Sequence, residues 1–149
     1  MIELHLDDSD LQRGLGQLLS NARNPAPMMK GIAEELHNAT KDNFSNEAWG
    51  GSRWPKSKAA AERKGKTLYD TGELYDSITT KTGPRFARIG SNMKYAAIHH
   101  MGGQAGRGRK LTLPARPYLP VRGDGKLQPK LETNLLEIAL ECLKKGVVK

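Results

Sequence analysis

The stretch from Lys126 to Lys145 limits the possible folds of this chain more than any other part of it. Apolar side chains recur there at helical spacing on one face and on a flanking face. The first face holds Leu127, Leu131, Leu135, Ile138 and Cys142, and the flanking face holds Leu136, Leu140 and Leu143. We therefore predict a long C-terminal helix. A stripe of this breadth is expected to be buried on two sides or shared with another subunit.

The N-terminal third of the chain predicts one short strand followed by two helices. Apolar and polar residues alternate over residues 2–6, and this period of two is typical of a strand. Aspartate and serine then favour a helix start, and leucines at helical spacing predict a helix over residues 9–24. This helix should end before Pro25, because proline disfavours helical geometry in the residue that precedes it. A second helix is predicted from Pro27 or Met28 to about Ala48, because apolar side chains recur there at helical spacing. They are Met29, Ile32, Leu36, Ala39 or Thr40, and Phe44.

Residues 49–66 contain glycine, proline and lysine in quantity and are interpreted as a loop that carries one short helix over residues 57–64. Trp54 lies in this loop, directly before a proline. A tryptophan in such a position pins the loop onto the body of the protein or onto a neighbouring molecule. We favour pinning within the chain and keep a direct binding role as the alternative.

A short helix and a hairpin are predicted next. Asp70 and Glu73 have the spacing of a capping box, in which the aspartate carboxylate replaces the usual hydroxyl. The helix that starts there is expected to bury Leu74 and Ile78. Strand-favouring runs on both sides of a Gly-Pro-Arg turn then predict a hairpin over residues 79–89.

The following segment combines a helix with a basic loop. Residues 94–101 predict a helix of about two turns, ended by Gly102 in the left-handed conformation. Residues 104–109, with the adjacent Lys110, place three basic side chains among glycines. Because glycine loses much conformational freedom on ordering, we expect a segment that is disordered or mobile in the isolated protein and orders only against a partner subunit or DNA.

Residues 111–113 predict another strand, and residues 115–120 predict a proline-stiffened turn that tucks Tyr118 and Leu119 into the core. These elements together predict an α+β fold in a single domain over residues 1–149. Its small, mainly antiparallel sheet would combine the N-terminal strand, the central hairpin and this last strand. Helices from the N-terminal half and the long C-terminal helix would pack against that sheet.

The composition argues against several protein classes. The apolar runs are too short for a transmembrane helix, which needs about 20 such residues, and the start of the chain lacks the pattern of a secretory signal. The single cysteine, Cys142, excludes a disulfide framework within the chain and fits a reducing compartment. The glycines after Met101 resemble a phosphate loop, yet the Lys-Ser/Thr ending and the following helix are missing. We expect no membrane contact and no cofactor.

Charge is distributed unevenly along the chain, whose net charge is +8. Residues 1–48 hold eight acidic and four basic residues, whereas residues 77–123 hold nine lysines and arginines and no acidic residue. Such a surface is expected to attract a polyanion or an acidic protein, although a plain solvated face is the alternative. The candidate partner- or DNA-contacting residues are Arg107, Arg109, Lys110 and Arg116. Contact with DNA would be non-specific and salt-dependent, because aromatic residues for stacking and a recognition-helix motif are lacking.

The sequence gives little support for a catalytic site or a metal site. His99 and His100 are adjacent, so on a helix their side chains point about 100° apart and cannot easily share one ion. Cys142 lies in an apolar helical pattern, where a structural thiol is expected. No Ser-His-Asp arrangement is evident. We predict that the chain is not an enzyme.

Three short motifs occur in order between Trp54 and Leu119. The first is Trp-Pro after a glycine-bearing loop, and the second is LYDTGELYDSI over residues 68–78. The third runs from Gly90-Ser91 through YA, His and GG to PARPYL. In order and spacing these motifs resemble the phage virion morphogenesis family, which includes Mu-type and P2-type tail completion proteins and prophage relatives. The matching residues are Trp54, Thr71, Gly72, Leu74, Ser77, Ile78, Tyr95, His99, Gly102, Gly103, Pro114, Pro117, Tyr118 and Leu119.

The resemblance implies a structural role for these motif residues and a non-enzymatic protein of late virion assembly. Such a protein would join head to tail or complete the tail. Its partners would be further copies of itself in a ring and other phage head, neck or tail proteins, and it would be found in the virion and, during assembly, in the bacterial cytoplasm. The family often has glutamine where this chain has His100, so the role of His100 stays open. The alternative function is that of a small basic nucleic-acid-binding protein.

Overall fold

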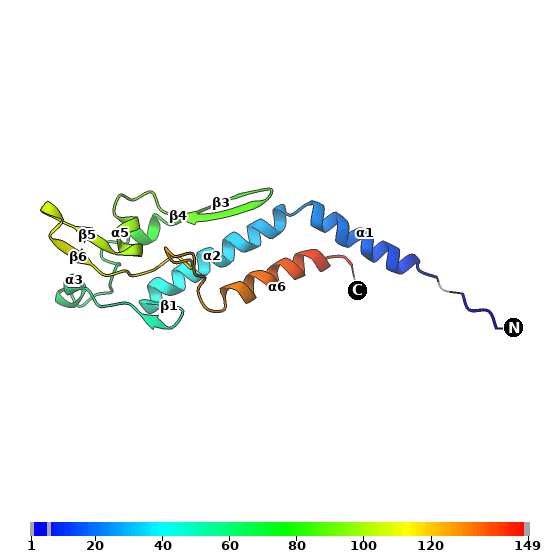
Figure 1. Cartoon of the computed structure of the whole chain (residues 1–149), viewed down its shortest axis with the longest axis horizontal. Coiled ribbons are helices and arrows are strands. Elements are labelled where there is room, and N and C mark those ends of the chain that lie inside the picture. The colour runs from blue at the N-terminus through cyan, green and yellow to red at the C-terminus, as the bar shows by residue number, and fades with distance from the viewer. Residues whose placement is uncertain (1, 6, 148–149) are drawn as a thin grey trace.

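The computed structural model describes residues 2–5 and 7–147. Its helices are α1 Ser9–Arg23, α2 Ala26–Asn46, α3 Lys58–Glu62, α4 Glu73–Asp76, α5 Ala96–Met101 and α6 Leu131–Lys144. Its strands are β1 Ala48–Trp49, β2 Ser52–Arg53, β3 Thr79–Gly83, β4 Phe86–Gly90, β5 Gly103–Ala105 and β6 Leu111–Leu113. The molecule is elongated, with α1 at one end and the β5–β6 hairpin at the other (Figure 1). The predicted α+β class is confirmed.

Helix α2 is the central element of the fold. Its buried side chains recur at helical spacing and are Ala33, Leu36, Thr40, Asn43 and Phe44. Helix α6 packs along one side of α2 and the β3–β4 hairpin along another (Figure 1). The helix ends at Glu47, which adopts a left-handed conformation with φ of 49° and turns the chain into β1. The predicted second helix is therefore confirmed to within about two residues.

The strands of the described residues form three separate two-stranded antiparallel sheets rather than one sheet. The predicted hairpin of β3 and β4 is confirmed, with Lys81 opposite Arg88. The predicted strand over residues 111–113 is also present, but it pairs with β5, so Gln104 lies opposite Thr112. The β1–β2 hairpin was not predicted, because each of its strands has only two residues and leaves no periodicity to detect.

The predicted N-terminal strand is wrong for the residues that the structure describes. Residues 2–5 form no regular structure, and Ile2 and Leu4 are 88% and 92% exposed. Alternating apolar residues favour a strand only where a neighbouring strand supplies hydrogen bonds, and no strand lies at this end of the molecule (Figure 1). Leu6 lies outside the described residues.

Helix α1 is confirmed, but the leucines of its apolar stripe are exposed to solvent. Leu11, Leu15 and Leu19 are between 51% and 61% exposed. The helix meets α6 through a different face, on which the Asn21 side-chain amide donates hydrogen bonds of 2.8 and 2.9 Å to the carbonyls of Leu143 and Lys145. The described part of the chain therefore leaves these three leucines more than half exposed.

Helix α6 begins at Leu131, five residues later than predicted. Leu127 forms an isolated bridge with Val121 instead of a helical turn, and Lys130 takes a left-handed conformation with φ of 69°. Pro129 lacks the backbone N–H that a helix interior needs, so the helix cannot extend back through it. The predicted two-sided burial is also incomplete. Leu131 is buried, whereas on the flanking face Leu136 and Leu140 are 57% and 49% exposed.

The main hydrophobic core lies at the end of α2 away from α1. It consists of Phe44, Trp54, Leu74, Ile78, Ala96 and Tyr118. The Phe44 ring lies 5.8 Å from the Trp54 ring and 5.3 Å from the Tyr118 ring, centroid to centroid. Full burial of an aliphatic or aromatic side chain contributes about 1.5–3 kcal/mol, so this cluster fixes the loops that meet there. No helix among the described residues is long and apolar enough to span a membrane.

Candidate functional site

Two of the sequence motifs meet at Trp54, although they are far apart in the chain. Trp54 is buried, and its Nε1 donates a 2.8 Å hydrogen bond to the carbonyl of Pro117. Tyr118 is also buried, and its hydroxyl donates a 2.6 Å hydrogen bond to the carbonyl of Ala96. Burial raises the pKa of Tyr118 to about 12, which keeps the hydroxyl protonated. As predicted, the proline-rich turn inserts Tyr118 into the core and Trp54 pins its loop within the chain.

His100 supports the same turn from the other side. Its Nε2 lies 2.8 Å from the carbonyl of Val121, and its Nδ1 accepts hydrogen bonds from the backbone N–H groups of Tyr118 and Leu119 at 3.2 and 3.3 Å. This pattern requires a neutral imidazole with the proton on Nε2. Burial lowers the pKa of His100, while the bond to Val121 partly offsets this effect. The sequence left the role of His100 open, and the structure assigns it a structural one.

Gly102 allows α5 and the proline-rich turn to approach each other closely. A Cβ atom at this position would lie 2.7 Å from the backbone nitrogen of Ala115 and 2.9 Å from the carbonyl oxygen of Leu113. Gly102 has φ of 73° and ψ of 176°, which is a positive-φ conformation but not the predicted left-handed helical cap. Its extended ψ leads the chain directly into β5, where Gly103 pairs with Leu113. Glycine is required here by both space and backbone conformation.

The motif over residues 68–78 supplies both core residues and a loop. The capping box predicted within it is wrong. The Oγ1 of Thr71, not the Asp70 carboxylate, accepts a 3.4 Å hydrogen bond from the N–H of Glu73. Asp70 instead forms a 3.5 Å ion pair with the Nε of Arg63. Gly72, with φ of 88°, turns the chain so that α4 can place Leu74 in the core.

Ser77 ends α4 and ties it to the loop after β4. Its hydroxyl donates a 2.6 Å hydrogen bond to the carbonyl of Leu74 and lies 2.6 Å from the hydroxyl of Ser91. Ile78 follows in the buried core. The serine and isoleucine of this motif therefore connect α4, the core and the Gly90-Ser91 segment.

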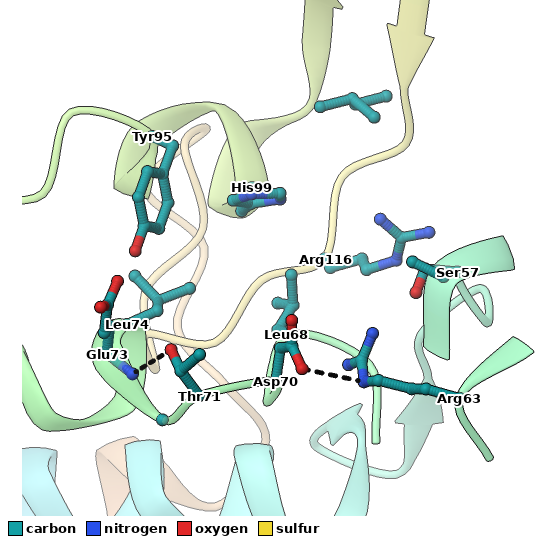
Figure 2. Close-up of a pocket in the computed structure, with 13 residues that line it drawn as sticks. Ser57, Arg63, Leu68, Asp70, Thr71, Glu73, Leu74, Tyr95, His99 and Arg116 are labelled. Carbon is teal, nitrogen blue, oxygen red and sulfur yellow. Dashed lines mark hydrogen bonds and ion pairs between the residues drawn. The ribbon is translucent and has the colours of Figure 1, made fainter. Parts of the chain in front are cut away.

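A pocket of about 360 Å³ opens among α3, the loop before α4, α5 and the segment after β6 (Figure 2). Its apolar wall includes Leu68, Leu74 and Leu113. Its polar lining consists of Ser57, Arg63, Asp70, Thr71, Glu73, Tyr95, His99 and Arg116. Figure 2 shows Glu73 and Tyr95 on one side of the pocket and Arg116 with Ser57 on the other. The pocket thus gathers several motif residues that the sequence could not place relative to one another.

Arg116 and His99 are polar side chains of this pocket that combine burial of polar atoms with incomplete hydrogen bonding. Arg116 is only 5% exposed, and its Nε donates a 2.7 Å hydrogen bond to the carbonyl of Pro55. None of the ion pairs formed by the described residues includes Arg116. The Nδ1 of His99 is buried without a hydrogen-bond partner in the described part of the chain. Burial and then the charge of Arg116 lower the pKa of His99, which favours a neutral ring.

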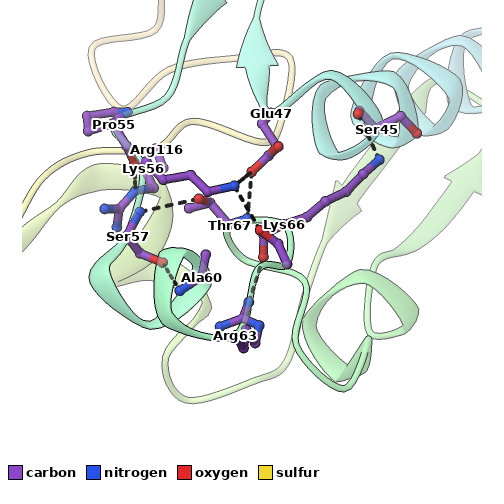
Figure 3. Close-up of polar contacts among 11 residues, drawn as sticks. Ser45, Glu47, Pro55, Lys56, Ser57, Ala60, Arg63, Lys66, Thr67 and Arg116 are labelled. Atoms are coloured by element: carbon purple, nitrogen blue, oxygen red, sulfur yellow. Dashed lines mark hydrogen bonds and ion pairs between the residues drawn. The ribbon is translucent and has the colours of Figure 1, made fainter.

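A polar network that the sequence did not reveal holds the loops on both sides of α3 (Figure 3). The Glu47 carboxylate accepts a 2.6 Å hydrogen bond from the N–H of Thr67 and lies 3.4 Å from the Nζ of Lys56. The buried Thr67 hydroxyl accepts a 3.3 Å bond from the N–H of Ser57, which caps α3. Burial alone would raise the pKa of Glu47, but the hydrogen bond from Thr67 and the contact with Lys56 lower it overall. No local pattern connects residues twenty positions apart, so sequence reasoning missed this network.

The basic segment predicted to be disordered or mobile is largely a hairpin arm. Gly103–Ala105 pair with Leu111–Leu113, and Arg107–Arg109 form a 3-10 turn at the tip. Arg107, Arg109 and Lys110 are all exposed. Arg116, which was grouped with them, is buried in the pocket wall and does not share their surface. The exposed Pro114 links the arm to the proline-rich turn.

The histidine pair does not form one site, because His99 faces the pocket while His100 bonds to the turn. Within residues 2–5 and 7–147, no group of three or more His, Cys, Asp or Glu side chains is placed to hold a metal ion. Cys142 is a free, partly buried thiol on α6. The described residues therefore offer a pocket and an exposed arm as candidate contact sites.

Comparison with known proteins gives one family match and two informative relatives. The model of the phage virion morphogenesis family matches residues 6–144. The Mu-like prophage FluMu G protein 2 of Haemophilus influenzae is 38% identical over 138 residues, which cover 92% of each chain. The putative capsid assembly protein G of Escherichia phage Mu is 39% identical over 83 residues, which cover 54% of this chain and 52% of that protein. No solved structure matches the chain.

Proposed function

Because the chain belongs to the phage virion morphogenesis family, we propose that it is a non-enzymatic structural protein that completes the tail or joins head to tail. It acts late in virion assembly, as a ring of identical subunits that also contacts other phage head, neck or tail proteins. Two relatives support a place in particle assembly. One is named as a Mu-like prophage protein and the other as a putative capsid assembly protein.

The exposed leucine stripe of α1 is the observation that carries the oligomeric part of this proposal. Leu11, Leu15 and Leu19 are at least 51% exposed and lie on one face of the helix. On α6, Leu136 and Leu140 are exposed in the same way. Single exposed leucines are ordinary, but aligned stripes on two neighbouring helices are typical of surfaces that associate. Covering them with other copies of the chain removes this apolar surface from water.

Charge separation between the two ends of the molecule supports head-to-tail contacts. Glu3, Asp7, Asp8 and Asp10 lie at the α1 end, and Arg107, Arg109 and Lys110 lie at the tip of the β5–β6 arm. These ends point in opposite directions (Figure 1). Opposite charges on different surfaces of one subunit favour heterologous association, which closes into a ring when the rotation between neighbours allows it.

Deletion of the gene from its phage or prophage tests the proposed function. After induction, electron microscopy should show separate heads and tails, or tails with defective ends, and the titre of infectious particles should fall by several orders of magnitude. Supplying the intact gene in trans is the control and should restore the titre. Infectious particles of normal number and shape from the deletion strain would refute the proposal.

Non-specific DNA binding is a second candidate function, favoured by the exposed arm. Three basic side chains on a projecting hairpin can contact phosphates without reading bases. This role is compatible with a ring through which DNA passes, and it also describes the alternative of a free-standing nucleic-acid-binding protein. The two are separated by the deletion experiment, because a free-standing binder is not needed for joining heads to tails.

A further inference from the structure

The pocket lined by Arg116 contains a buried positive charge that no described residue neutralises. Arg116 is 5% exposed, and the one side-chain hydrogen bond that it makes in the described structure runs from Nε to the carbonyl of Pro55. The neighbouring Arg63 already pairs with Asp70. Figure 2 shows Glu73 on the far side of the pocket, beside Tyr95. A guanidinium held in low dielectric without a counter-ion is unfavourable, and an anion that enters the pocket would compensate it.

The other walls of the pocket favour a ligand that has an apolar part in addition to its negative charge. Leu68, Leu74 and Leu113 give the pocket a largely apolar lining. The unpartnered Nδ1 of His99 adds one further polar group. The pocket volume of about 360 Å³ has room for a few side chains of a peptide. The occupant should therefore combine a carboxylate with an adjacent aliphatic side chain.

The segment Ile2–His5 of the chain has this chemistry and is uncovered. Ile2 and Leu4 are 88% and 92% exposed, and the side chain of Glu3 between them is 71% exposed. In the described residues, the ion pair that Glu3 forms is a 3.7 Å contact with His5, whose side chain is 90% exposed. In an extended peptide the side chain of Glu3 and those of Ile2 and Leu4 point to opposite faces, so they can contact different walls of one pocket.

The segment cannot reach the pocket of its own chain. It lies beyond α1 at one end of the elongated molecule, whereas α3, α5 and the β5–β6 hairpin lie at the other end (Figure 1). We propose that the pocket receives the segment Ile2–His5 of a second copy of the chain. The Glu3 carboxylate pairs with Arg116, and Ile2 or Leu4 packs on the leucine wall. This inference rests on the self-association in the proposed function and identifies one of its contacts.

A phosphate of DNA fits this pocket less well than a glutamate. A phosphodiester carries its charge between two polar sugars, which would face the leucine wall. The exposed Arg107, Arg109 and Lys110 offer phosphates three solvated cations elsewhere on the molecule. The carboxylate of an apolar peptide segment is the better match for a single buried guanidinium.

Peptide binding to the full chain tests the proposal without requiring ring formation. A fluorescent peptide with the sequence of residues 2–10 is titrated into full-length protein that carries Ile2→Asp and Leu4→Asp, so that its own segment no longer competes. We expect saturable binding, displacement by unlabelled peptide and no binding of a scrambled peptide. A peptide with Glu3→Gln should bind about tenfold more weakly, since it loses a charge-assisted contact of about 1.4 kcal/mol or more. This comparison uses one protein preparation and does not depend on the folding of a pocket variant.

A pair of matched variants on α3 locates the binding site. Ala59 and Ala61 are both exposed on this short helix, but only Ala59 is among the residues that line the pocket. Ala59→Trp should block the pocket and weaken peptide binding at least tenfold, whereas Ala61→Trp should leave it unchanged. Equal binding by both variants, no saturable binding, or displacement of the peptide by a short DNA duplex would overturn the proposal. The deletion phenotype tests the assembly function separately, so either idea can fail while the other stands.

Discussion

The indole Nε1 of Trp54 donates a 2.8 Å hydrogen bond to the carbonyl oxygen of Pro117, and this bond joins segments 63 residues apart. The Phe44 ring contacts both the Trp54 ring and the ring of Tyr118, the residue after Pro117. The Trp-Pro motif and the PARPYL motif are therefore two halves of one packing unit around the end of α2. The contact between the two motifs forms part of the core and positions the wall of the nearby pocket.

Substitutions at Trp54 should separate the contribution of the ring from that of the hydrogen bond. Trp54→Phe keeps an aromatic ring but leaves the Pro117 carbonyl without its donor, so we expect a loss of about 1–3 kcal/mol in the free energy of unfolding. Trp54→Ala also leaves a cavity and should cost about 3–5 kcal/mol. Urea unfolding followed by circular dichroism measures both values. A Trp54→Ala variant as stable as the parent would contradict the assigned contact.

Gly102→Ala should loosen the hairpin arm from the body of the protein. The new Cβ would lie 2.7 Å from the nitrogen of Ala115 and 2.9 Å from the carbonyl oxygen of Leu113, and both are backbone atoms that cannot move alone. The positive φ adds strain, so we expect a loss of more than about 1 kcal/mol in stability. Amide exchange of residues 103–113 should accelerate more than that of α2. Gly16→Ala is the control, since nothing lies within 4 Å of a Cβ there, and it should be neutral or stabilising.

The long helices were predictable from the sequence because each repeats its apolar residues over several turns. The spacing of Leu36, Thr40 and Phe44 places α2 correctly, and the leucines after Leu131 place α6. The β3–β4 hairpin followed from local turn chemistry. The wrong predictions concerned segments whose structure depends on neighbours in the folded protein, which the periodicity of apolar residues does not reveal. Residues 2–5 alternate like a strand but have no strand beside them in the described structure.

The sequence predicted which residues are important but not which of them lie together in the candidate site. The motif resemblance selected Thr71, Tyr95 and His99, but their common pocket depends on how α4 and α5 pack. Arg116 was grouped with the residues of the arm as a candidate contact residue, and only the tertiary structure shows that it lies buried beside Pro55, away from them. The carboxylate of Glu47 gave no signal at all, because its partner Thr67 lies twenty residues away.

Acidification should destabilise the protein through His100. Burial lowers the pKa of this histidine below its ordinary value of 6.5, so the unfolded chain takes up the proton at a higher pH than the folded protein does. The contribution to stability is complete above about pH 6.5 and falls as the pH drops below it. Partly buried His99, whose pKa is also lowered by burial, acts in the same direction.

Urea midpoints at about pH 8 and about pH 5.5 measure this dependence across the range in which histidine titrates. The variant His100→Gln cannot titrate there, so its midpoint should change less between the two conditions than that of the parent. His5→Gln is the matched control, because the His5 side chain is 90% exposed, and it should behave like the parent. An undiminished pH dependence in His100→Gln would show that other groups are responsible.

Leu15→Asp should weaken self-association and leave folding intact. Leu15 is 55% exposed in the middle of the α1 stripe, so a carboxylate there stays in water in the free subunit but is buried if the stripe forms a subunit interface. We expect at least a tenfold increase in the dissociation constant, measured by analytical ultracentrifugation, with an unchanged circular dichroism spectrum. Ser20→Asp adds the same charge to an exposed position about 140° around the same helix and should have little effect. Equal assembly of parent and Leu15→Asp would exclude the stripe from the interface.

The basic arm should determine how DNA affinity depends on salt. Arg107, Arg109 and Lys110 are exposed on the β5–β6 arm, and each phosphate contact releases condensed counter-ions from DNA. If all three contact phosphates, changing them together to alanine should reduce the slope of log K against log salt by about 3, at roughly one per residue removed. Fluorescence anisotropy with a duplex of arbitrary sequence measures this slope. Lys41, Lys58 and Lys64 provide a control triple, because they are exposed and lie outside the arm. A slope that changes equally in both triple variants would mean that the overall positive charge of the protein, and not the arm, determines DNA binding.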